Sequence, residues 1–120
     1  MRLAILAWLS LVAACQEGIH VTVEQDAGKA RFIVTPVAER FRTCIRTVNV
    51  YGPQTTADRK VPIWHLERRD PEVCVASLDF GVAPQGFEGD PPTAQLRPGT
   101  RYEVALMGPG FNDGAAFIAR

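Results

Sequence analysis

The stretch that most constrains the fold is Leu96–Met107, which reads LRPGTRYEVALM. Pro98 and Gly99 are turn residues, because proline presets φ and glycine accepts a positive φ. Beyond them apolar and polar residues alternate, which is the period of a strand with one buried face. Three residues share the face expected to be buried: Tyr102, Val104 and Leu106. The stretch therefore predicts a turn that leads into a core strand.

The same stretch resembles the L-x-P-x-T-x-Y-x-V pattern of fibronectin type III domains. The pattern is carried by Leu96, Pro98, Thr100, Tyr102 and Val104. The resemblance implies a β-sandwich with a tyrosine corner, in which a buried tyrosine at a strand start returns its hydroxyl to the backbone upstream. It therefore implies that Tyr102 is the corner residue.

The N-terminus has the pattern of a secretory signal. Arg2 precedes Leu3–Ala14 (LAILAWLSLVAA), which is apolar apart from Ser10. This run is shorter than the roughly 20 residues of a membrane-spanning helix and suits the apolar region of a signal peptide. The alternative is a buried first element of a cytosolic domain, which would have almost no polar face. We expect residues 1–14 to be a lipoprotein signal peptide.

Val12–Cys15 (VAAC) resembles the bacterial lipobox, a branched aliphatic residue and two small residues before a cysteine. The resemblance implies that the Cys15 thiol carries a diacylglyceryl group, and Gln16 in place of aspartate favours the outer membrane. The alternative is ordinary cleavage after Ala14, which leaves Cys15 as a free thiol. The predicted organisation is a signal peptide at 1–14, a lipidated tether at 15–17 and one domain at 18–120.

That domain is predicted to be all-β, because apolar residues alternate in short runs with turn residues between them and no segment has helical periodicity. Seven short strands of this kind favour an immunoglobulin- or fibronectin III-like β-sandwich. Pro62 suggests that the fourth strand lies at a sheet edge. The expected strands are Ile19–Glu24, Ala30–Val34, Cys44–Val50, Val61–Glu67, Val73–Phe80, Tyr102–Leu106 and Ala115–Arg120.

The cysteines favour one disulfide. If Cys15 is acylated, Cys44 and Cys74 remain as a pair, and paired cysteines of an exported chain usually form a bridge. Each is expected near the start of a strand and on its core-facing side. A metal site is the weaker alternative, because His20 and His65 are the only histidines and zinc needs four ligands.

Residues capable of catalysis are few. Ser77 is the only serine after the signal segment, and it lies within an expected strand rather than a nucleophile elbow. His65 and Glu67 are a candidate acid–base pair, with a solvated strand face as the alternative. Glu67, Asp70 and Glu72 lack the spacing of a calcium loop, and basic residues interrupt them. We expect a protein that is not an enzyme and has no catalytic residue, metal site or cofactor.

The connection Gly81–Gln95 is the predicted binding loop. It is longer than ordinary strand connections, and long ordered loops are often functional. Pro84, Pro91 and Pro92 restrict its backbone and so lower the entropy lost on binding. Phe87 stands outside any alternating strand, either as an aromatic anchor for a partner or as a cap on the open end of the core.

Equal numbers of basic and acidic residues, 13 of each, give no basic surface for nucleic acid. The lipobox, a W-x-L strand and the F-G-x-x-P-x-G-F stretch of Phe80–Phe87 resemble a group of small uncharacterised bacterial lipoproteins. The resemblance implies a lipid-anchored envelope protein, facing the periplasm, with a binding or structural role and another envelope protein as its partner. The alternatives are a small envelope enzyme or carbohydrate-binding module, and a membrane-presented inhibitor of another enzyme.

Overall fold

A computed structural model describes residues 18–38, 42–53 and 60–120. The expected signal peptide, the tether and Cys15 lie outside these residues. All regular structure in the described residues is β. The strands are β1 (Ile19–Asp26), β2 (Lys29–Pro36), β3 (Thr47–Tyr51), β4 (Trp64–Arg68), β5 (Ser77–Asp79), β6 (Phe87–Glu88), β7 (Arg101–Gly108) and β8 (Phe111–Ile118).

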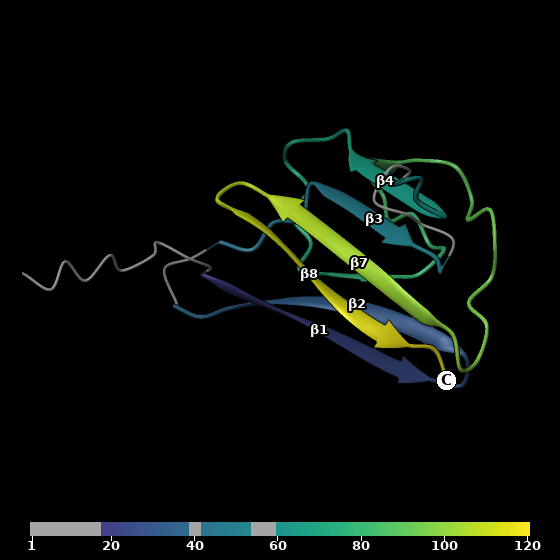
Figure 1. The fold of residues 1–120 in the computed structure, drawn as a ribbon. Coiled ribbons are helices and arrows are strands. Elements are labelled where there is room, and N and C mark those ends of the chain that lie inside the picture. Colours follow the sequence, from purple (N-terminus) through teal and green to yellow (C-terminus); the bar gives the residue numbers. More distant parts are fainter. Residues whose placement is uncertain (1–17, 39–41, 54–59) are drawn as a thin grey trace, which may run out of the picture.

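The strands form two antiparallel sheets (Figure 1). One has three strands in the order β1-β2-β5, and the other has five in the order β6-β4-β3-β7-β8. The all-β prediction is confirmed, but the described residues contain eight strands rather than seven, because the two-residue strand β6 forms within Gly81–Gln95. The predicted edge position of β4 is wrong, since β4 pairs with β3 on one side and β6 on the other. Pro62 precedes β4 and so removes no ladder hydrogen bond.

Alternate residues of the longer strands fill the space between the sheets. In β7, Tyr102, Val104 and Leu106 are all buried, as the alternation predicts. Aromatic rings connect the layers, because Phe117 of β8 lies 5.7 Å from Phe32 of β2 and 5.8 Å from Tyr102, measured between ring centroids. Such offset and tilted ring pairs stabilise a core beyond the area that they bury.

Two tight hairpins set the strand registers. Ala27 and Gly28 connect β1 to β2 with φ values of 48° and 78°, the two positive values that a type I′ turn requires. Pro109 and Gly110 connect β7 to β8. The last strand therefore begins at Phe111, which pairs with Gly108, and not at Ala115 as expected. Two residues are therefore enough to reverse the chain between β7 and β8.

The predicted disulfide is confirmed, since Cys44 and Cys74 are bridged with a Cα–Cα distance of 4.7 Å. Their predicted placement is wrong. Both lie outside strands, which begin only at Thr47 and Ser77, and Cys74 is exposed rather than core-facing. Strand alternation fails here because the chain before β5 bonds to both layers at once. The carbonyl of Val75 accepts from the Ile45 N–H (2.9 Å), and the next carbonyl, that of Ala76, accepts from β2.

An exposed ion pair joins the outer face of β2 to β5, with 2.8 Å between Arg31 Nε and Asp79 Oδ1. The hydrogen bond and the charge of Asp79 raise the pKa of Arg31 above its ordinary value. Both side chains are about half exposed to solvent, so the pair adds little to stability. Arg31 and Asp79 are also opposite each other in the β2–β5 ladder.

Candidate functional site

The connection from Gly81 to Arg97 lies against β4 along most of its length. Its residues Phe87 and Glu88 form β6, pairing with Arg68 and Glu67 of β4. Farther along, the Thr93 N–H donates to the Ile63 carbonyl at 2.8 Å. Backbone hydrogen bonds therefore fix this long connection to the edge of the five-stranded sheet (Figure 1).

Two glycines allow this close approach. Gly86 has a φ of 88°, and a Cβ there would lie 2.6 Å from Cγ2 of Val73. A Cβ on Gly89 would overlap the His65 carbonyl and contact the Leu66 side chain. A larger residue at Gly89 would push the connection away from β4, and one at Gly86 would press on the turn at residues 70–73, so both glycines set the path of this segment.

Phe87 lies in β6, contrary to its expected place outside any strand. Its side chain is half-buried and packs against the core cluster, and its N–H donates to the Pro84 carbonyl at 3.0 Å. Pro84 and Pro92 are half-buried, whereas Pro91 is exposed. The four residues predicted for a binding surface therefore do not form a single exposed face.

An apolar cleft of about 430 Å³ opens beside this connection, at the end of the sheet where β4 and β7 begin. Val61 is 69% exposed there, and Ile63 and the buried Tyr102 contribute further apolar surface. Its lining residues are Gly52, Pro53, Val61, Pro62, Ile63, Thr93, Ala94, Gln95, Arg97, Thr100 and Tyr102.

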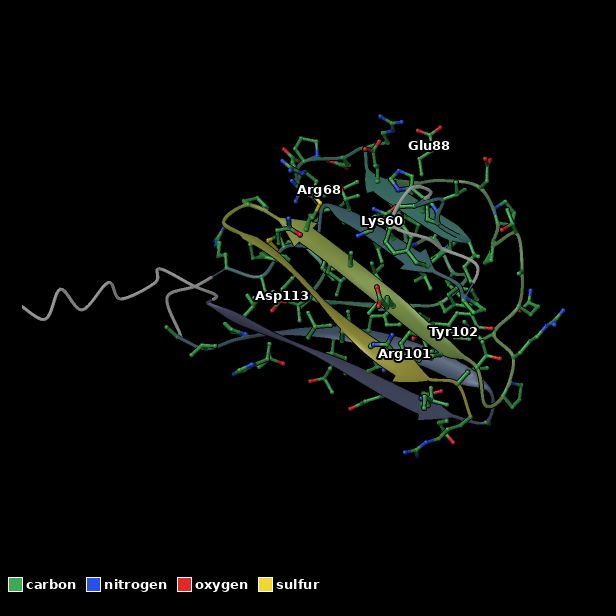
Figure 2. All side chains as sticks on the ribbon, in the orientation of Figure 1. Lys60, Arg68, Glu88, Arg101, Tyr102 and Asp113 are labelled. Atoms are coloured by element: carbon green, nitrogen blue, oxygen red, sulfur yellow. A yellow bond between two sulfur atoms is a disulfide. The ribbon has the colours of Figure 1, made fainter. Side chains whose placement is uncertain are left out.

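Tyr102 connects this cleft to the core. Its ring is buried, and its hydroxyl accepts a hydrogen bond from the Arg97 backbone N–H at 2.8 Å. This is the geometry of a corner tyrosine, with the hydroxyl as the acceptor. Figure 2 places Tyr102 at the end of the sandwich where β7 begins. The hydrogen bond fixes the chain just before β7, which forms one wall of the cleft.

A second, charged groove of about 450 Å³ lies along β4 and the 88–93 segment. Arg69 pairs there with Glu88 at 2.7 Å and with Glu67 at 3.7 Å. His65 Nδ1 lies 2.6 Å from the side-chain oxygen of Asn49. The candidate acid–base residues His65 and Glu67 thus have different partners, and the groove presents a network of ion pairs.

The other candidates from the sequence are dispersed. Ser77 is exposed at the start of β5, and Asp70 Oδ1 accepts from the Glu72 N–H at 3.0 Å within its own turn. In the part of the chain that the structure describes, no three His, Cys, Asp or Glu side chains gather as metal ligands. The cleft itself was not predicted, because Val61 and Ile63 have the pattern of an ordinary strand.

Comparisons with protein-family models, with curated proteins and with solved structures found no match. Across the described ranges, no helix has the length and apolar character needed to cross a membrane.

Proposed function

We propose that this chain is a lipid-anchored protein of the bacterial cell envelope that binds another envelope component through the apolar cleft beside β4. The observation that carries the proposal is the cleft itself. Apolar side chains such as Val61 and Ile63 line it together with the polar residues Gln95, Arg97 and Thr100. Its wall is formed by a connection that the Thr93–Ile63 backbone hydrogen bond fixes in place. A concave apolar site with fixed walls binds with little loss of conformational entropy.

The proposed fold family is the immunoglobulin- or fibronectin III-like sandwich. Its support is the strand order, in which β1, β2 and β5 correspond to strands A, B and E, and β3, β7 and β8 to strands C, F and G. Tyr102 then lies at the start of strand F, where a corner tyrosine is expected. Domains of this architecture perform many tasks, so the cleft and not the fold suggests binding.

The proposed anchor rests on the lipobox at Val12–Cys15. If Cys15 is lipidated, only Gln16 and Glu17 separate it from Gly18, a reach of about 10 Å. The domain would therefore lie close to the membrane surface. Replacing Cys15 by serine should stop palmitate incorporation and release the chain from the membrane fraction. Detection of a mature N-terminal peptide with an unmodified Cys15 would refute the anchor.

The binding site is tested with a photoreactive amino acid at Val61 in the full chain, expressed in its own cells. The control is the same probe at Val82, which is 57% exposed but does not line the cleft. We expect one discrete protein adduct from position 61, none from position 82, and loss of the adduct when Ile63→Arg fills the cleft. Equal labelling at both positions would refute the site, and an adduct with glycan alone would favour a carbohydrate-binding module.

A further inference from the structure

We propose that the chain forms a two-fold symmetric dimer in which β1 pairs edge to edge with β1 of a second copy. This inference goes beyond the proposed binding function and uses a different surface. β1 is the edge strand of the three-stranded sheet, and it is eight residues long (Figure 1). A long, regular edge strand with an unpaired backbone is a template for pairing with another strand.

The hairpin register shows which backbone groups of β1 face outward. The turn at Ala27 and Gly28 is closed by the pair Asp26 and Lys29, so the even-numbered residues of β1 bond to β2. The odd-numbered residues 19, 21, 23 and 25 direct their N–H and C=O groups away from β2. Within the described ranges, no other backbone group bonds to them.

The neighbouring edge strand, β8, is protected by side chains. The Gln25 amide donates to the Ile118 carbonyl and accepts from the Arg120 N–H, both at 2.9 Å. Asp113 Oδ1 accepts from the Gly114 N–H at 2.7 Å. Side chains therefore already occupy three backbone groups in β8 and just beyond its end. Local bonding of this kind competes with strand addition at β8, so β1 is the more accessible of the two neighbouring edges.

The sequence of β1 is complementary to itself when two copies run antiparallel around Thr22. In this register His20 lies opposite Glu24 of the second copy, and Thr22 lies opposite its own equivalent. Val21 lies opposite Val23 of the second copy on the inner face, where both are half-buried in one chain. Opposite charges, paired threonines and paired β-branched residues are favourable cross-strand neighbours. A shift by two residues would place His20 opposite Thr22 or opposite Asp26 of the second copy, and Glu24 would then lie opposite Gly18 or Thr22 instead of a histidine.

The expected dimer is weak. One strand edge buries less than the roughly 1,200 Å² of a stable interface, so pairing depends on concentration. If the proposed lipid anchor holds two chains on one membrane, their effective concentration rises and favours the dimer. The test therefore traps the dimer covalently in cells that make the full chain.

The trap is the variant Thr22→Cys. In the proposed register position 22 forms a non-hydrogen-bonded pair with itself, with Cα atoms about 4.5 Å apart, which a disulfide spans. His20→Cys is the matched control, because its two copies would be about 13 Å apart. We expect a band of twice the chain mass on non-reducing gels for Thr22→Cys, and only the level of the parent chain for His20→Cys. Equal bands from both variants, or none from Thr22→Cys, would overturn the dimer.

Charge and edge variants in the Thr22→Cys background test the register further. His20→Glu places two carboxylates opposite each other and should lower the trapped fraction about fivefold, whereas adding Glu24→Lys should restore it. Val21→Pro removes an outward N–H and should abolish trapping, while Ala116→Pro, which removes an outward N–H of β8, should not. Urea midpoints confirm that each variant is folded. A trapped fraction unaffected by His20→Glu, or lowered equally by both prolines, would refute the interface.

Discussion

Removal of one oxygen atom tests the contact that positions β7. Tyr102→Phe keeps the ring, which is stacked on Phe117 at 5.8 Å, and deletes only the hydroxyl that accepts from the Arg97 N–H. That N–H then loses its acceptor in a partly buried position. Leaving such a donor unpaired costs about 1–2 kcal/mol.

For a domain of this size that loss corresponds to a fall in melting temperature of about 5–10 °C. The assay is urea unfolding followed by tryptophan fluorescence, since Trp64 is buried in the core. The midpoint should fall while the slope with urea stays constant, because the surface exposed on unfolding is unchanged. Hydrogen exchange of the Arg97 amide should also accelerate, as its protection depends on this one bond.

Tyr51→Phe is the matched control, since Tyr51 is the only other tyrosine and is half-exposed on β3. It should change the free energy of unfolding by no more than about 0.5 kcal/mol. If Tyr102→Phe and Tyr51→Phe have equal effects, the hydroxyl of Tyr102 does not hold the turn before β7.

The remaining predictions concern the other contacts that hold the layers together. Phe87→Ala should lower the free energy of unfolding by about 2 kcal/mol, because a half-buried ring is lost, whereas Val82→Ala in the same connection should be neutral in a urea titration. Replacing Cys44 and Cys74 by alanine should cost about 3–4 kcal/mol, and reductant should then have no further effect on the melting temperature. Gly89→Ala should cost about 1–3 kcal/mol, because its Cβ meets β4, and it should weaken photocrosslinking from the cleft if the connection moves.

The sequence predicted those features that depend on local periodicity and turn chemistry. The alternation in β7 located its buried face, and the even pair of cysteines indicated the bridge. The errors share a physical cause, namely backbone bonding between segments distant in sequence. β6 exists only because β4 lies beside it. Cys74 faces solvent where the chain after it bonds to Ile45, ahead of β3, and to Val34 of β2. The cleft arises from the packing of the 93–100 segment on Ile63, which no local pattern encodes.

The position of the disulfide determines how the chain responds to mechanical load. Cys44 and Cys74 are 30 residues apart, so the bridge closes a loop that contains all of β3 and β4. A force applied to the two ends of the chain extends the β1–β2 hairpin and all strands from β5 onward. The force passes through the bridge, so the loop between the two cysteines carries none of it. At about 3.5 Å per extended residue, the oxidised chain stretches about 100 Å less than the reduced one. Single-molecule stretching would measure this difference in length, and the length would show whether the disulfide is oxidised or reduced.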